Sequence, residues 1–265
     1  MRTTRGENVR PAAVAGSFYP EHPKQLRTVV DTLLAAVPQY RGPPPKAVIA
    51  PHAGYIYSGA AAAHAFAALR DSPRDFDRVV VIGPAHYVAV DGIAIPNAEA
   101  FETPLGRVPV DREALATIGD LPGVTAADAP HAPEHALEVE LPFLQSVLGP
   151  FSLVPLLVGD ATPEAVAHVL APLWDDALIV VSSDLSHYLG YDAATRRDAL
   201  TAAAIERHDG AAVGPNDACG FLAVAGLLKH AERRGLKAQR LALCNSGDTA
   251  GPRDRVVGYG AWAFA

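Results

Sequence analysis

The sequence predicts a three-layer α/β/α fold with a central mixed sheet, formed by residues 1–265 as a single domain. Apolar runs at 47–50, 79–82 and 151–158 show little polar alternation, which is typical of strands covered by helices on both faces. Stretches with helical spacing lie between the apolar runs, and this alternation favours a layered α/β sheet. No linker divides the chain, so we expect one domain.

Composition limits the classes of function. With 265 residues, 49% of them hydrophobic, the chain can bury a substantial core. Its formal net charge is -7 and no run of basic residues occurs, which argues against a nucleic-acid binder or a binder of anionic membranes. Two cysteines, Cys219 and Cys244, do not form a disulfide framework and favour a reducing compartment. We therefore expect small-molecule chemistry.

The expected location is the cytoplasm. Residues 1–10 are polar and lack the apolar stretch of a secretory signal. No segment is apolar for the roughly 20 residues that cross a bilayer, because the alanine-rich run at 60–69 contains His64 and is followed by Arg70. We expect no membrane partner.

The first half of the chain predicts a helix, then strands. Apolar positions recur on one helical face from Leu26 to Val37, and Pro38 ends the pattern. The stiff connector Gly-Pro-Pro-Pro at 42–45 leads into the first core strand. Ser58 suits the N-cap of a second helix. The further expectations are strands at 79–82 and 91–96 and a turn-rich excursion at 100–110.

The second half continues the alternation. Asp111 is expected to cap a short helix at 111–118. Residues 119–134 are rich in Pro, Gly and Asp, which predicts a loop that could form the wall of a site. The remaining expectations are helices at 141–148, 163–173, 192–208 and 218–233, and strands at 151–158, 177–181, 237–243 and 256–264.

Polar side chains follow four predicted strands directly. His52 and His86 follow the strands at 47–50 and 79–82, Asp184 and His187 follow the strand at 177–181, and Cys244 follows the strand at 237–243. In open α/β sheets, ligands bind outside the carboxyl ends of the strands. The sequence therefore predicts a site at this edge.

His52, His86 and Cys244 are candidate metal ligands. Two imidazoles and a thiolate suit iron, copper or zinc, and three protein ligands leave a coordination position open. The alternative is that each is an ordinary core residue, since free cysteine is among the most buried residue types.

Asp184 and His187 are three residues apart, so both can face one pocket as further ligands or as an acid/base pair. The alternative is a helix cap and a local hydrogen bond. Glu134, His135 and Glu138 are better explained as a solvated helix start, where acidic side chains are favoured, and their roles stay open.

Nucleophilic hydrolysis is the rival chemistry. Cys244 beside a histidine could be an activated thiolate, and Ser182 or Ser183 could pair with His187. The chain has no Gly-x-Ser-x-Gly elbow, Gly-rich phosphate loop or Cys-x-x-Cys pair.

Several motifs in order resemble the Memo family, whose bacterial members are called AmmeMemoRadiSam system protein B. The motifs run across nearly the whole chain and are RPAAVAGSFYP at 10–20, PHAGY at 51–55 with Ser58 and Gly59, GPAH at 83–86, EHALE at 134–138, SSDLSHY at 182–188 and CNSGD at 244–248.

The resemblance implies a fold similar to class III extradiol dioxygenases, with a metal pocket of His52, His86 and Cys244 and with Asp184 and His187 as additional pocket residues. Those dioxygenases use two histidines and a carboxylate, so Cys244 departs from their ligand set. A thiolate ligand favours copper(I) or alters the potential of iron, and it can itself be oxidised.

Three hypotheses follow. The first is a metal-dependent oxidoreductase using iron(II) or copper, with zinc less favoured, that acts on a small molecule. The second is a non-catalytic protein that binds a metal, a peptide or another ligand. The third is a Cys or Ser hydrolase. The family name also implies a functional link to radical SAM and AMMECR-type proteins.

Overall fold

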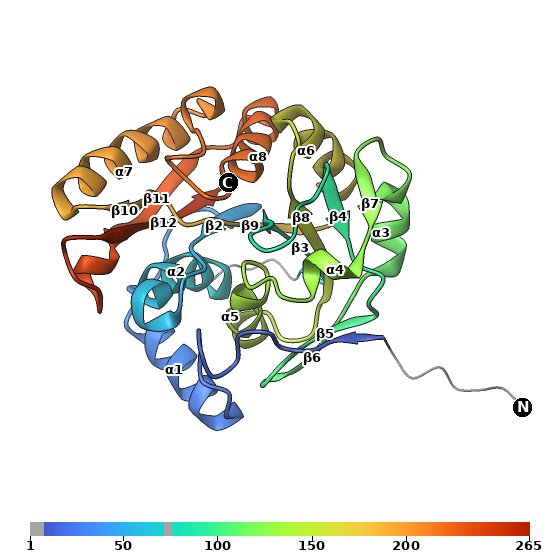
Figure 1. The fold of residues 1–265 in the computed structure, drawn as a ribbon, viewed down its shortest axis with the longest axis horizontal. Helices are drawn as coiled ribbons and strands as arrows, with labels where there is room; N and C mark the ends of the chain where they lie inside the picture. The colour runs from blue at the N-terminus through green and yellow to red at the C-terminus, as the bar shows by residue number, and fades with distance from the viewer. Residues whose placement is uncertain (1–7, 72–75) are drawn as a thin grey trace, which may run out of the picture.

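A computed structural model describes residues 8–71 and 76–265 of the chain. A mixed β-sheet lies between two layers of helices, as Figure 1 shows. The predicted three-layer α/β/α class is confirmed. Most of the polar segment at residues 1–10 lies outside the described residues.

The central sheet has the strand order β10-β12-β2-β9-β3-β8-β4-β7, and β11 pairs with residues 258–264 of β12. Its four central strands, β2, β9, β3 and β8, are parallel, whereas β12 and β4 run antiparallel to their neighbours β2 and β8. The strands are β2 (Ala47–Ala50), β3 (Arg78–Pro84), β4 (Ile93–Ile95), β7 (Val124–Ala126), β8 (Ser152–Val158), β9 (Leu178–Ser182), β10 (His187–Leu189), β11 (Ala238–Asn245) and β12 (Val256–Phe264).

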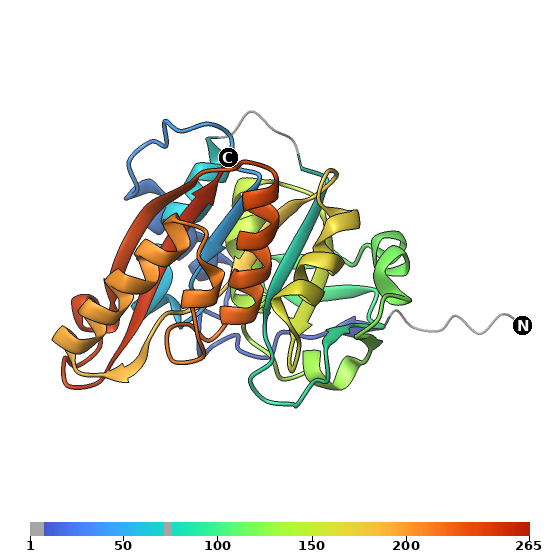
Figure 2. The ribbon, with the colours of Figure 1, turned by 90° about the horizontal axis from the view of Figure 1, so that it is seen from above.

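Helices cover both faces of this sheet. One layer holds α1 (Pro23–Ala35), α2 (Tyr55–Arg70) and α5 (Leu141–Val147), and the other holds α6 (Pro163–Leu170), α7 (Tyr191–Glu206) and α8 (Phe221–Arg233). Figure 2 shows the second layer in front of the strands. The shorter α3 (Arg112–Gly119) and α4 (Asp128–His131) lie beside β7 and β4.

Local sequence explains most of these elements. The apolar face predicted for the first helix packs into the core, because Leu26, Val30 and Leu34 of α1 are buried. The Asp111 side chain caps α3 by accepting from the Ala114 N–H, as predicted. The core strands β2 and β9 are buried along their whole length, which fits their continuous apolar runs.

The start of α2 differs from the prediction. The helix begins at Tyr55 with Gly54 as N-cap, three residues before Ser58. The Tyr55 N–H donates to the Phe18 carbonyl 2.8 Å away, and the buried Tyr55 ring anchors this turn. Ser58 instead donates its hydroxyl proton to the Ala53 carbonyl within the first turn.

Two predicted irregular regions contain regular structure. Residues 100–110 form a hairpin of β5 (Ala100–Thr103) and β6 (Gly106–Pro109), which builds a small second sheet with β1 (Val9–Arg10). The predicted loop 119–134 contains β7 and α4. Both differences depend on strand partners distant in sequence, since β1 pairs with β5 and β7 pairs with β4.

Short 3₁₀ segments complete the described structure: η1 (Glu138–Glu140), η2 (Ala171–Leu173), η3 (Gly210–Ala212) and η4 (Ser246–Asp248). Among the described helices, none is both long enough and apolar enough to span a bilayer.

Candidate metal centre

Three neighbouring parallel strands deliver polar residues to one edge of the sheet. β9 lies between β2 and β3, and all three run in the same direction. His52 follows β2, His86 follows β3 and Asp184 follows β9. Because the carboxyl ends of parallel strands share one edge, these three residues are neighbours, as the sequence predicted.

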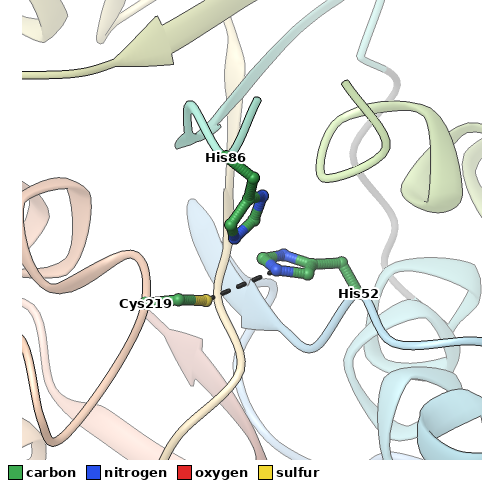
Figure 3. A group of neighbouring side chains, drawn as sticks. All are labelled: His52, His86 and Cys219. Atoms are coloured by element: carbon green, nitrogen blue, oxygen red, sulfur yellow. Dashed lines mark hydrogen bonds between the residues drawn. The ribbon is translucent and has the colours of Figure 1, made fainter. Parts of the chain in front are cut away.

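His52 and His86 form a donor group with Cys219. One ligand atom from each residue lies within 4.8 Å of the others, and His52 Nε2 is 3.4 Å from Cys219 Sγ. Figure 3 shows the three side chains pointing toward one another from three separate segments. Two imidazoles and a thiol at this spacing could hold one transition-metal ion.

Cys219 is held there by the loop after β9. The Asp184 N–H points at Cys219 Sγ at 3.3 Å, and the Cys219 N–H donates to the Asp184 carbonyl at 3.2 Å. The next residue, Gly220, donates its N–H to Ser183 Oγ at 3.0 Å. These bonds fix the start of α8 against the carboxyl edge of the sheet.

The structure does not bring Cys244 into this group. Cys244 lies within β11 opposite Tyr259 of β12, and β11 is separated from β2 by β12. The described donor groups contain Cys219 in the place expected for Cys244. The CNSGD motif still reaches the site, because Ser246 lines the same cavity as the histidines.

Sequence reasoning missed Cys219 because it does not follow a strand. It lies in the connection between α7 and α8, where residues 218–233 read as one helix. The sequence feature that could have indicated the position of Cys219 is the glycine that follows it, Gly220. A Cβ on Gly220 would lie 2.9 Å from the Ser182 carbonyl oxygen, so glycine allows this close backbone approach.

Glu134 orients His86. His86 Nδ1 lies 2.9 Å from Glu134 Oε1, and the His86 N–H donates to Glu134 Oε2 at 2.6 Å. The carboxylate also accepts the N–H groups of His135 and Ala136. Burial acts to raise the pKa of Glu134, but the bonds from His86 outweigh it and hold the pKa at about 2. An ionised Glu134 therefore accepts from Nδ1 and leaves Nε2 for a metal.

A third imidazole completes the cluster. The ring of His135 stacks on His86 with centroids 4.7 Å apart, and it meets His52 edge to face at 5.3 Å. Its Nδ1 is 3.2 Å from Glu134 Oε1. Burial, with the neighbouring His52, lowers the pKa of His135 to about 4, so the ring is neutral at neutral pH. His135 is thus a pocket residue.

Burial also sets the charge of the donor pair. Only 1% of His52 is exposed, and desolvation lowers its pKa to about 3. Burial and the nearby Asp184 raise the pKa of Cys219 to about 12. The pair is therefore a neutral imidazole beside a neutral thiol, the opposite of an activated thiolate nucleophile. A metal ion would bind the imidazole directly and displace the thiol proton.

Asp184 and His187 both line the cavity, as predicted. The Asp184 carboxylate accepts the His52 N–H at 2.8 Å, and burial raises its pKa. His187 Nδ1 lies 2.8 Å from the Leu185 carbonyl oxygen. Since a carbonyl only accepts, His187 carries its proton on Nδ1, and Nε2 can accept a proton.

The predicted Ser–His187 pair is absent from the contacts of the described residues. Ser182 Oγ lies 2.7 Å from His52 Nδ1, and Ser183 Oγ contacts the Asp184 carbonyl and the Gly220 N–H. Both hydroxyls thus serve other partners.

A cavity of about 540 Å³ opens over His52 and His86, whereas Cys219 lines a separate cavity of about 210 Å³. The wall of the larger cavity includes the three histidines of the cluster together with Asp184 and His187. Its other lining side chains include five aromatic rings and one guanidinium: Phe18, Tyr57, Tyr87, Tyr188, Tyr259 and Arg255. This volume suits a small-molecule ligand.

Glu138, whose role the sequence left open, lies away from the cavity. Its carboxylate pairs with the Arg10 guanidinium and accepts from the Tyr19 hydroxyl and the N–H groups of Ala13 and Val14. This buried ion pair ties the N-terminal segment to the loop that carries Glu134 and His135.

The fold and the site define an α/β protein with a candidate His–His–Cys metal centre at the carboxyl edge of its sheet. The family model described as Memo-like protein matches residues 10–263. The chain belongs to the Memo family, as its motifs indicated.

Curated relatives match along nearly their whole length. A MEMO1 family protein of Sulfolobus acidocaldarius is 34% identical over 280 residues, covering 95% of this chain and 97% of that protein. MEMO1 family proteins of Aquifex aeolicus and Aeropyrum pernix are each 35% identical, with 95% and 96% of this chain and 97% and 98% of theirs covered.

Proposed function

We propose that this protein is a metal-dependent redox protein in which His52, His86 and Cys219 hold one iron(II) or copper ion. The observation that carries the proposal is the convergence of these three donors within 4.8 Å of one another, with His52 and His86 at the wall of an open cavity. The buried His52 is neutral, and the more exposed His86 is oriented by the Glu134 carboxylate at Nδ1; a neutral imidazole held by such a partner is the state that ligates a metal.

The donor set favours iron or copper. Imidazole suits both metals, and a thiolate adds preference for copper(I) or alters the potential of iron. When bound, such an ion would supply electron-transfer chemistry at a coordination position that the protein leaves open. Zinc fits the ligands but not a redox role, so we rank it below the other two.

The chain's own residues bind and orient the substrate and move protons. His187 lines the cavity and bonds the Leu185 carbonyl through Nδ1, which leaves Nε2 as its proton acceptor, and the aromatic wall with Arg255 binds a small molecule or a peptide side chain. Asp184 fixes the backbone of His52 and so the position of the first donor. The fold of extradiol dioxygenases, implied by the family resemblance, supports this use of the pocket.

Anaerobic metal analysis tests the proposal. The wild-type protein should retain iron or copper in stoichiometric amount, and His52→Ala, His86→Ala and Cys219→Ser should each lose it. Cys244→Ser is the matched control and should keep the metal. Unchanged stoichiometry in all three site variants would end the proposal.

Oxygen consumption with a reductant then distinguishes two uses of the centre. Turnover that His187→Gln reduces while metal content stays constant would support an oxidoreductase. Bound metal that passes to a competing chelator without any turnover would instead support a non-catalytic metal-binding protein.

The cytoplasmic location and the link to radical SAM and AMMECR-type proteins are part of this proposal and rest on the sequence alone.

A further inference from the structure

Ser182 stands between the metal centre and a buried glutamate. Its Oγ lies 2.7 Å from His52 Nδ1, 2.6 Å from the Ala136 carbonyl oxygen and 2.7 Å from Glu140 Oε1. Ser182 and Glu140 have no exposed surface. The hydroxyl therefore shares its hydrogen bonds with these three groups and not with bulk water.

The number of protons available to Ser182 Oγ determines which group donates in each of its three hydrogen bonds. A hydroxyl can donate one hydrogen bond and accept two. The Ala136 carbonyl can only accept, so it must receive the Ser182 proton. The other two partners must then donate to Ser182 Oγ, which requires a proton on His52 Nδ1 and a proton on Glu140 Oε1. With an ionised Glu140, the hydroxyl would face two acceptors at 2.6 and 2.7 Å with one proton between them.

We propose that Glu140 is a neutral carboxylic acid that donates to Ser182 and thereby fixes His52 as the Nδ1–H tautomer, with its Nε2 lone pair directed at Cys219 and the metal. Glu140 is a positioning residue in this scheme. Its effect on the metal rests on the proposed function above, whereas its protonation is a property of the protein alone.

The surroundings of Glu140 agree with a neutral acid. Burial, together with the Asp184 carboxylate, raises the pKa of Glu140 well above the usual glutamate value. Its Oε2 is buried and has no hydrogen-bond partner among the described residues. A neutral carbonyl oxygen tolerates this far better than a carboxylate oxygen, because burying an unpaired charge is much more costly.

Glu138 provides an internal comparison. It is also fully buried and lies only two residues away, but its carboxylate accepts from the Arg10 guanidinium, two backbone N–H groups and the Tyr19 hydroxyl. These donors compensate a negative charge. Among the described residues, the hydrogen-bond partner of the Glu140 carboxyl group is Ser182. The same residue type thus has several donors that can compensate a charge at one position and no such set at the other.

The protonation state can be tested in the metal-free protein by infrared spectroscopy at neutral pH. The wild type should show the carbonyl stretch of a protonated carboxylic acid, and Glu140→Gln should lack that band. Glu138→Gln, the matched control, should leave the band in place. A wild-type spectrum that Glu140→Gln does not change in this region would overturn the proposal.

The consequence for His52 is tested by metal affinity. Glu140→Gln keeps a donor to Ser182 and should bind iron or copper as the wild type does. Glu140→Met has similar length but no donor, and it should weaken binding roughly 10- to 100-fold, the usual effect of losing an outer partner of a ligand. Equal loss in both variants would show that the charge of Glu140 matters and would contradict the neutral acid. Absence of metal from the wild type would refute the proposed function while leaving the infrared result intact.

Discussion

His86 Nδ1 lies 2.9 Å from Glu134 Oε1, and the same carboxylate accepts the backbone N–H of His86 at 2.6 Å. The carboxylate therefore fixes both the main chain and the ring of one candidate ligand. Such carboxylate–histidine pairs set the tautomer of a ligating imidazole and increase its basicity.

Replacing Glu134 should weaken the metal centre. Glu134→Gln keeps the shape of the side chain but removes the charge that attracts the His86 Nδ1 proton, so we expect metal affinity to fall roughly 10- to 100-fold. Competition with a chromogenic chelator measures this change. Glu164 lies on α6 and forms a surface ion pair with Lys229 of α8, so Glu164→Gln should leave metal affinity unchanged. Equal affinities for wild type and Glu134→Gln would refute the orienting role.

The two cysteines should behave differently. Loaded with cobalt(II), the wild type should show a sulfur-to-metal charge-transfer band, because Cys219 Sγ lies in the donor group. Cys219→Ser should lose the band, whereas Cys244→Ser should keep it, since Cys244 lies in β11 opposite Tyr259. A band that depends on Cys244 would mean that the loaded site differs from the donor group described above.

Glu140 should give a measurable pH dependence of stability. Its folded-state pKa is raised well above the reference value of 4.5, so the folded protein holds a proton that the unfolded chain releases. The stabilisation from this group is complete below pH 4.5 and is lost as pH rises toward the folded-state pKa. Between pH 4.5 and the folded-state pKa, the wild type should therefore lose up to ~1.4 kcal/mol of unfolding free energy per pH unit relative to Glu140→Gln.

Urea unfolding of the metal-free protein at several pH values measures this slope. Ser182, Asp184 and Tyr55 are the neighbours that interact with Glu140, and they are unchanged in the variant. Glu140→Met should show the same slope at lower overall stability, because it too lacks the titrating proton. Parallel pH profiles for wild type and Glu140→Gln would contradict a neutral Glu140.

Gly220 should not tolerate a side chain. A Cβ there would lie 2.8 Å from Ser183 Cβ and 2.9 Å from the Ser182 carbonyl oxygen, so the backbone must shift. We expect Gly220→Ala to destabilise the protein by about 1–3 kcal/mol and to weaken metal binding by displacing Cys219. In Gly119→Ala the nearest atom would be Ile95 Cδ1 at 3.9 Å, and stability should change by less than about 0.5 kcal/mol. Similar unfolding free energies for the two variants would argue against this close packing.

The sequence was sufficient for the layers and for half of the site. Continuous apolar runs predicted buried parallel strands, and the rule that ligands collect at their carboxyl ends placed His52, His86 and Asp184 together. These features are local, because a strand and the residue that follows it are adjacent in the chain.

Only the tertiary structure decided which cysteine joins the histidines. Cys244 follows the same pattern as the histidines, but its strand pairs with β12 at a distance from β2. Cys219 has no strand before it and reaches the site because α8 packs on β3 and β9 and because its turn is bonded to Asp184. The hydrogen bonds of Ser182 to Ala136 and Glu140 likewise join residues more than 40 positions apart. Such contacts depend on how whole elements pack, and a pattern read along the chain contains no information about that packing.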